Sequence, residues 1–274
     1  MLVLCGAAIA FLALPLVGLI WKVQWSSLPS IFGDAQVREA LWLSLVSSVL
    51  ACAASVVFGV PLAWLLARYD FRGSGVVRAL CTLPMVLPPV VGGVALLFAL
   101  GRNGLVGRYL DEWFGLRLPY SMAATVIAQT FVAMPFLVMT AETAFRRCDM
   151  VSEAVAATLG ASRWSTFVRV TLPQARHGLF AGAAIAWGRA LGEFGATVTF
   201  AGNFPGKTQT IPLAVYIELE RRPERAVALS LVLVAVSFAV LIGLRGYWLE
   251  GVVRWQRSLR DIDIDIDSEQ EAVR

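Results

Sequence analysis

Apolar residues gather in long runs along the chain, and short polar segments separate these runs. A backbone group inside lipid has no water to bond, so a run that crosses a bilayer must form its own hydrogen bonds as an α-helix. About 20 residues suffice for one crossing, and every run approaches this length. The pattern predicts an all-α integral membrane protein with six transmembrane helices. The runs cover residues 2–20, 41–66, 80–100, 122–144, 179–200 and 226–249.

The third run begins with the sequence LPMVLPPVVGG, which is unsuited to one undistorted helix. Pro88 and Pro89 lack the N–H that a helix interior needs. Irregular backbone at membrane depth is tolerated where it is buried in protein or lines a wet cavity. The sequence leaves two interpretations open, a kink near the start of a helix and a flexible element beside a transport path.

The fifth run carries two charges, Arg189 and Glu193, which are four residues apart and can pair on one helix face. Charged groups at membrane depth are costly, and they face a bundle interior or a cavity. They therefore predict a structural ion pair, a gate, or both. Gly188, Gly192 and Gly195 are expected to let another helix approach closely.

Polar side chains elsewhere in the fourth and fifth runs are candidates for lining a path. Gln129, Thr130, Thr197 and Thr199 each carry a group that can bond a passing ion. Each of them could instead bond the backbone or a neighbouring helix. The candidate path and gate residues are Arg189, Glu193, Thr197, Thr199 and Gln129.

The polar segment 149–173, between the fourth and fifth runs, has a helical pattern of its own. Val151, Val155 and Leu159 fall on one helix face, with Asp149 or Ser152 as the N-cap. Gly160 then permits a sharp turn. Ser162 can cap a second short helix, on which Trp164, Phe167 and Val168 share a face. The segment predicts two short amphipathic helices, which lie passively on the membrane surface or bind a soluble partner.

Composition agrees with a membrane protein, because only 15% of the 274 residues are charged and 58% are hydrophobic. A soluble domain carries about 25% charged residues. The net charge of +4 is spread along the chain, so we expect no nucleic-acid partner. Four cysteines without CxxC spacing predict free thiols, and the single histidine, His177, predicts no zinc site. We find no arrangement of nucleophile and base, so no catalytic residue is expected.

Arginine and lysine positions predict the orientation. With the N-terminus in the cytoplasm, 13 of them fall in cytoplasmic segments and 9 in outer ones. Basic residues are enriched on the cytoplasmic side, so both termini and segment 149–173 are expected there.

Segment 149–173 also resembles the cytoplasmic loop of bacterial ABC importer permeases, which carries the EAA signature. Gly160, Val170 and Leu172–Pro173 match the spacing of that signature, whereas Glu153 lies seven residues before the glycine instead of six. The sequences LPMVLPPVVGGVALLFALGRNGLVG and GRALGEFGATVTFAGNFPGKTQTIPLAVYIELE resemble the molybdate permease family. Sulfate permeases share its RALGEFG core.

This resemblance implies the type I ABC importer permease fold in a bacterial plasma membrane, as a homodimer with a second copy of the chain. It implies two cytoplasmic ATP-binding subunits and an extracytoplasmic binding protein that delivers an oxyanion. The permease then imports molybdate without a cofactor or ATPase site of its own, and the partner subunit uses ATP. The residues expected to couple to the ATPase are Glu153, Ala154, Thr158, Leu159, Gly160 and Ala161.

Other interpretations remain open at this stage. A permease for tungstate, sulfate or thiosulfate would share these motifs. An ion-coupled secondary transporter, from a different class, usually shows internal repeats, and we find none. Residues 1–260 are expected to form one transmembrane domain, followed by a short acidic, disordered tail at 261–274. The sequence AGNFPGKT at 201–208 fits a phosphate-binding loop only loosely, because an apolar run and not a strand precedes it.

Overall fold

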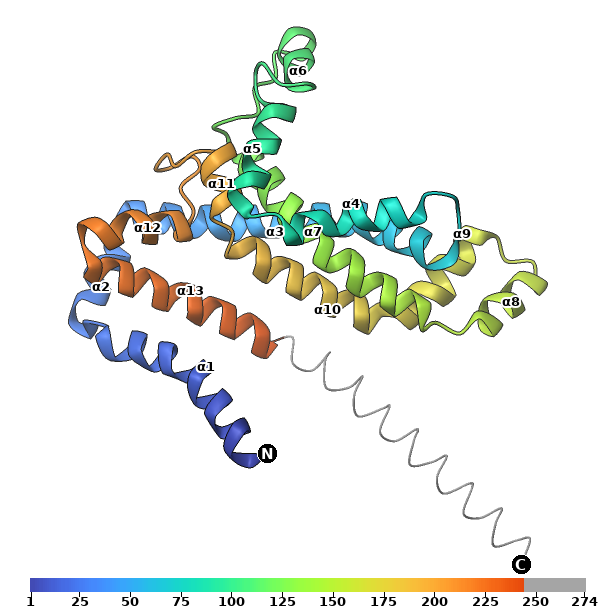
Figure 1. Cartoon of the computed structure of the whole chain (residues 1–274), viewed down its shortest axis with the longest axis horizontal. Coiled ribbons are helices and arrows are strands. Elements are labelled where there is room, and N and C mark those ends of the chain that lie inside the picture. The colour runs from blue at the N-terminus through green and yellow to red at the C-terminus, as the bar shows by residue number, and fades with distance from the viewer. Residues whose placement is uncertain (244–274) are drawn as a thin grey trace, which may run out of the picture.

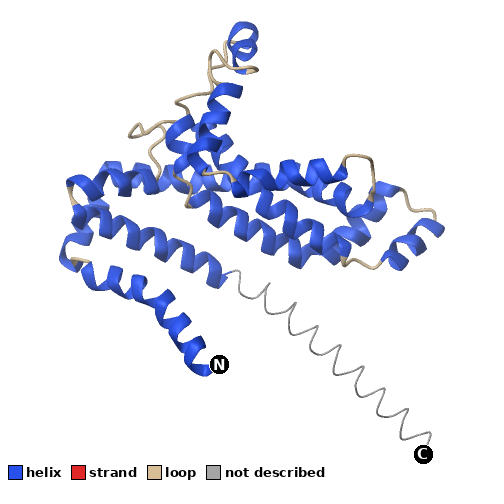
Figure 2. Ribbon diagram, viewed as in Figure 1, coloured by secondary structure: helices blue, strands red, loops and turns tan. Residues whose placement is uncertain are grey.

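A computed structural model describes residues 1–243, and within them every regular element is a helix (Figure 2). The predicted tail at 261–274 and the end of the sixth apolar run lie outside the described residues. The first half holds α1 (Leu2–Lys22), a short 3-10 turn (Trp25–Ser27), α2 (Leu28–Gly33), α3 (Ala35–Arg68), α4 (Ser74–Val86), α5 (Pro89–Leu100) and α6 (Gly107–Phe114). The second half holds α7 (Met122–Arg146), α8 (Met150–Thr158), α9 (Arg163–Thr166), a π-helical turn (Phe167–Thr171), α10 (Leu172–Leu191), α11 (Gly195–Phe200), α12 (Ile211–Arg221) and α13 (Pro223–Gly243).

Four of these helices are long and apolar enough to cross a membrane, namely α1, α3, α7 and residues Pro223–Val240 of α13. The chain is therefore a multi-pass membrane protein. The pair α4 and α5 also passes this test together, but it is bent by 119°. The bend lies at Leu87 and Pro88, so the break predicted in the third apolar run is confirmed.

The fifth apolar run differs from its prediction. Its helix α10 begins earlier, at Leu172, and ends at Leu191, and the rest of the run forms the separate short helix α11. The earlier start brings Arg176 and His177 into the helix, and α10 is not among the four spans found by length and composition. A crossing by α10 therefore stays a prediction, and with it the count of six.

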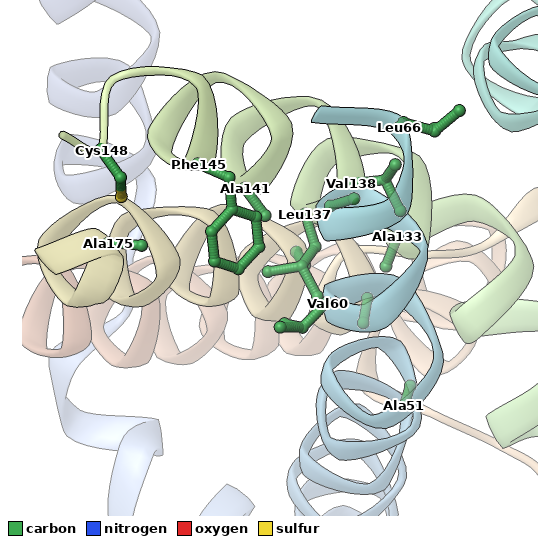
Figure 3. Packing of buried hydrophobic residues seen from close by; sticks show 13 residues of the cluster. Ala51, Val60, Leu66, Ala133, Leu137, Val138, Ala141, Phe145, Cys148 and Ala175 are labelled. Atoms are coloured by element: carbon green, nitrogen blue, oxygen red, sulfur yellow. The ribbon is translucent and has the colours of Figure 1, made fainter. Parts of the chain in front are cut away.

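The core lies where α3, α7 and α10 pack against one another. Many of its fully buried residues are small, among them Ala51, Ala133, Ala141, Ala186 and Ala190. Small residues let helix backbones approach closely, which is how membrane helices associate. Figure 3 shows the larger side chains of Leu137 and Phe145, which belong to the same buried cluster as these alanines.

Three groups of helices stand apart from this core (Figure 1). Helices α8 and α9 lie at one end of the bundle, and α12 lies at the other. Helices α5 and α6 project from its side. Helix α1 contacts α13 but has no buried residue of its own. The segment expected in the cytoplasm therefore lies at the opposite end of the bundle from α12, while α6 lies at its side (Figure 1).

Candidate functional site

Helix α8 begins at Asp149, as the sequence predicted. The Asp149 carboxylate accepts hydrogen bonds from the backbone N–H groups of Val151 (2.9 Å) and Ser152 (3.2 Å). It also accepts one from the Ser152 hydroxyl at 2.7 Å, so Ser152 supports the cap instead of forming it. This hydroxyl, followed by the amide of Val151, lowers the pKa of Asp149 below its ordinary value.

The end of α8 explains Gly160. Its N–H donates to the Ala157 carbonyl and that of Ala161 donates to the Ala156 carbonyl, both at 3.0 Å. These two bonds form the Schellman motif, which requires a left-handed residue at this point. Gly160 has φ +83°, and a Cβ there would have no neighbour within 4 Å. The backbone conformation, and not crowding, therefore favours glycine.

The second predicted short helix is not separate. Ser162 caps α9 as expected, with its Oγ accepting from the Ser165 N–H at 3.2 Å. The backbone then stays helical through the π turn and into α10, since Phe167 and Leu172 both have right-handed helical dihedrals. Proline is compatible with the first turn of a helix, and Pro173 lies there without breaking the chain direction. The helical backbone of this segment is therefore interrupted at Gly160 and not at Pro173.

Glu153 on α8 bonds to the bundle of its own chain. Its Oε1 lies 2.5 Å from Arg68 Nη2 at the end of α3 and accepts a hydrogen bond from Thr171 Oγ1 at 2.8 Å. The side chains of Arg68 and Glu153 are only 9% and 20% exposed. Glu153 thus fastens α8 to α3 and to the start of α10.

The opposite side of α8 is apolar and uncovered. Val151, Val155 and Leu159 are 69%, 51% and 82% exposed, and together they form what we call the α8 face. Ala154, Thr158 and Gly160 are exposed too, whereas Ala161 is half-buried. The prediction that these three residues share one face of the helix is confirmed. An exposed apolar surface of this kind is typical of a site that contacts another protein.

A second cluster lies around the break between α10 and α11. Arg189 Nη1 lies 2.5 Å from Glu193 Oε2, so the predicted pair forms, although α10 ends between the two residues. The Glu193 side chain is 1% exposed, and its Oε1 accepts from the Ala196 N–H at 2.9 Å. A carboxylate at this place stabilises the N-terminus of α11. Glu193 therefore joins α10 to α11.

Helices α5 and α11 cross at glycines. A Cβ on Gly93 would lie 2.7 Å from Thr199 Cβ and 2.8 Å from the Ala196 carbonyl oxygen. A Cβ on Gly195 would lie 2.9 Å from Pro89 Cβ. Real Cβ atoms essentially never approach so closely. The crossing of α5 and α11 therefore depends on the missing side chains.

Of the three glycines expected to permit close helix approach, only Gly195 does so within residues 1–243. A Cβ on Gly188 would meet no atom there, and one on Gly192 would meet only the Gly188 carbonyl oxygen at 3.6 Å. Gly93 was not singled out for such an approach, because its partners lie about a hundred residues later in the chain.

The polar path candidates divide into two classes. Thr130 and Thr199 donate to the carbonyl oxygens of Val126 and Gly195, one turn earlier in their own helices. The polar side-chain atoms of Gln129 and Thr197 are buried and make no hydrogen bond within the described chain, and the same holds for the hydroxyl of Thr125. Buried polar groups are normally bonded, so these three are free to bond water or an ion. Thr125 was not among the predicted path residues. Its position four residues before Gln129, one turn earlier on the same helix, could have identified it from the sequence.

In the part that projects from the side of the bundle (Figure 1), Asp111 on α6 joins two arginines from the flanking loops. Its carboxylate accepts from Arg117 Nε at 2.9 Å and from Arg102 Nε at 3.0 Å. The bond from Arg117, more than that from Arg102, lowers the pKa of Asp111. Leu105, Trp113 and Phe114 around this anchor are at least 70% exposed. The segment is therefore ordered around one carboxylate and offers apolar groups to a partner.

Comparison with known proteins agrees with this architecture. A family model described as "Binding-protein-dependent transport system inner membrane component" matches residues 59–254. The molybdenum transport system permease protein ModB of Mycobacterium tuberculosis is 46% identical over 237 residues, which are 86% of this chain and 89% of that protein. The protein of the same name from Escherichia coli is 39% identical over 216 residues (79% and 94%). The Escherichia coli sulfate transport system permease protein CysT is 33% identical over 237 residues, or 85% of each chain.

Solved structures share the fold. A bacterial ABC transporter involved in the import of alginate superimposes with a TM-score of 0.67 at 17% identity, covering 90% of this chain and 94% of that one. The MetNI methionine ABC transporter gives a TM-score of 0.59 at 16% identity, covering 77% and 95%. The family resemblance read from segment 149–173 is thus confirmed. This chain belongs to the binding-protein-dependent transport system inner membrane components, in the group of the molybdenum transport permeases, and has the type I ABC importer permease fold.

Proposed function

We propose that this chain is the membrane-spanning subunit of an ATP-driven importer for molybdate. The main support for the importer role is the α8 face, which is apolar and exposed. On the other side of the helix, Glu153 binds α8 to the bundle. The molybdate assignment is supported by identities of 39–46% to molybdenum permeases, against 33% to a sulfate permease.

Two cytoplasmic ATP-binding subunits dock on the α8 faces of two copies of the chain. Burying Val151, Val155 and Leu159 removes apolar surface from water and favours the complex. ATP is bound and hydrolysed by these partners, so the chain needs no cofactor and is not itself an enzyme. Residues 1–260 act as one transmembrane domain with both termini in the cytoplasm of a bacterium.

The Glu153 contacts make α8 a lever. When the ATP-binding subunits close, α8 moves, and its carboxylate pulls on Arg68 of α3 and on Thr171 beside α10. Helix α10 carries the motion to its other end, where Arg189 and Glu193 hold α11. Since α11 crosses α5 at Gly93, the motion reaches the projecting part of the molecule.

The path lies where α7 and α11 meet, beside the second copy. Gln129 and Thr197 offer unbonded polar groups there, while Thr199 bonds its own helix and shapes the α5 crossing. Glu193 largely neutralises Arg189, so the path attracts an anion only weakly. Weak binding lets an ion leave again, and the high affinity belongs to the binding protein.

A second copy covers the outer side of α4 and α5. Val86 and Phe98 on these helices are 83% and 75% exposed, and no described residue of the chain covers them. The binding protein docks away from α8, on segment 102–117 at the side of the bundle and on segment 202–225 at its other end (Figure 1). The apolar groups around Asp111 form part of that surface.

The lever can be tested with a double-mutant cycle on Glu153 and Arg68. Changing Glu153→Gln or Arg68→Gln is expected to lower ATP-driven uptake about tenfold, because a partly buried charge loses its partner. The double change is expected to cost little more than either single one, since both remove the same contact. Arg72→Gln, an exposed arginine at the same end, serves as the control. Additive losses in the double variant would contradict the lever.

The substrate is tested by reconstituting the chain with its ATPase and binding protein in proteoliposomes. ATPase activity is measured with the binding protein loaded in turn with molybdate, tungstate, sulfate and thiosulfate. We expect molybdate to stimulate hydrolysis most strongly. Stimulation by sulfate or thiosulfate alone would assign the chain to those anions, and a response to tungstate alone would do the same for tungstate. Uptake that needs an ion gradient but no ATP would instead indicate a secondary transporter.

A further inference from the structure

An apolar groove of about 860 Å³ runs between α3 and the segment that joins α9 to α10. Its walls are almost entirely carbon. Val57, Val60 and Pro61 line it on the α3 side, and Leu172, Leu179 and Phe180 line it on the α10 side. No part of the lever or the polar path described above uses this groove.

The groove has the length of one lipid leaflet. On α3 its lining extends from Val56 to Trp64, roughly 12 Å at ~1.5 Å per residue. On α10 it extends from Leu172 to Ala183, roughly 17 Å by the same measure. Half of the ~30 Å hydrocarbon core is about 15 Å. The length of the groove therefore matches that of an acyl chain in one leaflet.

The two ends of the groove differ in chemistry. Trp64 packs against Phe167 at one end, with ring centroids 5.2 Å apart. Arg163 lines the groove beyond Leu172 at this end, and Arg176 lines it about one turn after Leu172 on α10. Both arginines are exposed, and neither forms an ion pair within residues 1–243. At the other end Cys52 Sγ donates to the Ala183 carbonyl at 3.4 Å, and no charged residue lines it. The groove is thus amphipathic along its length.

We propose that this groove binds an anionic phospholipid, with one acyl chain along α3 and α10 and the phosphate on Arg163 and Arg176. Guanidinium groups bond phosphate oxygens in pairs, and basic pockets between membrane helices are suited to anionic headgroups. Tryptophans are enriched at the level of lipid headgroups, and Trp64 and Trp164 both line the groove. The assignment to the inner leaflet rests on the proposed function, which places α8 and α9 in the cytoplasm.

A helix of a second copy fits the groove less well. The uncovered helix α1 is apolar along its length and contains no acidic residue. It could fill the walls but would leave both arginines without a counter-charge. An anionic lipid supplies both the apolar chain and the negative group. Once bound, it would connect α3, α9 and α10 beside the point where Glu153 anchors α8.

The full chain is incorporated into phosphatidylcholine nanodiscs that contain a phosphatidylglycerol with a photoactivatable acyl chain, and labelled peptides are mapped by mass spectrometry. We expect labels within residues 56–64 and 172–183. A phosphatidylcholine probe with the same acyl chain should label them several-fold less. Arg163→Gln and Arg176→Gln are each expected to lower labelling by phosphatidylglycerol about fivefold, the equivalent of ~1 kcal/mol per basic residue at a membrane surface. Arg72→Gln, outside the groove, should leave labelling unchanged.

Equal labelling by the two probes, or labelling that is indifferent to both arginines, would overturn the proposal. So would cysteine cross-links that place α1 of a second copy along Val57 and Leu179. Labelling requires neither ATP nor molybdate. A failure of the lipid proposal would therefore leave the importer assignment intact, and a failure of the importer assignment would leave the labelling result standing.

Discussion

Changing Gly160→Pro is expected to abolish ATP-driven transport while the membrane bundle stays folded. Gly160 has φ +83°, whereas proline is fixed near −65°. Proline also lacks the N–H that bonds the Ala157 carbonyl and closes α8. A local cost of ~3 kcal/mol corresponds to roughly a 100-fold change in the population of the coupled arrangement. Uptake and ATPase activity in proteoliposomes measure the effect, and thermal unfolding measures the bundle.

The matched control is Gly160→Asn. Asparagine tolerates the left-handed conformation, and no neighbour lies within 4 Å of its Cβ, so it should retain most transport. Gly160→Ala should fall between the two, because a left-handed alanine costs ~1–2 kcal/mol. Wild-type coupling in the proline variant would show that the angle of α8 plays no part in transport.

Changing Gly93→Leu is expected to block transport by forcing α5 and α11 apart. The new Cβ alone would overlap Thr199 and the Ala196 backbone at 2.7–2.9 Å, so α5 and α11 must separate. Overpacking of a tight contact costs about 1–3 kcal/mol, and more where backbone opposes it. Uptake should fall at least tenfold, and the unfolding temperature should drop by several degrees. Binding of the ATPase subunits at α8 should remain.

Two further variants make this test specific. Gly93→Ala carries the same Cβ without the rest of the side chain and should show a smaller loss of the same kind. Gly33→Leu adds an equal side chain on α2, where no atom lies within 4 Å, and should transport normally. If Gly93→Leu transported as well as Gly33→Leu, the close crossing of α5 and α11 would have no role in the transport cycle.

Helix α10 connects the two regions that these variants perturb, which are α8 and the crossing of α5 with α11. Thr171, just before it, bonds Glu153 of α8, and Arg189 in its last turn pairs with Glu193, which holds α11. A helix of 20 residues is a rigid rod of roughly 30 Å. The proposed lever therefore predicts that displacement at α8 reaches the crossing at Gly93 through this rod.

Local features of the site were predictable from the sequence. Apolar runs and Pro88 placed the spanning helices and the break between α4 and α5. Asp149, Gly160 and Ser162 marked where α8 and α9 begin and end. The pairing of Arg189 with Glu193 followed from a spacing of four residues. Each of these depends on backbone chemistry or on neighbours within one helical turn.

Helix continuity was less predictable. A second short helix was expected before a separate fifth span at 179–200, but proline fits the first turn of α10 and the backbone continues through a π turn. The sequence pattern also did not distinguish Gly195, which is crowded, from Gly188, which is open. Both lie in the same apolar run, and only the position of α5 separates them.

The sequence by itself determined four of the membrane helices, the N-caps of α8 and α9 and the family of this protein, because these depend on local periodicity and contiguous motifs. Only the tertiary structure decided that Glu153 bonds Arg68, that Gly93 packs on Ala196, and that α3 and α10 enclose an apolar groove whose lining includes two arginines. These contacts join residues about a hundred positions apart. Their energies depend on distances of a few ångströms between helices, which no local pattern specifies.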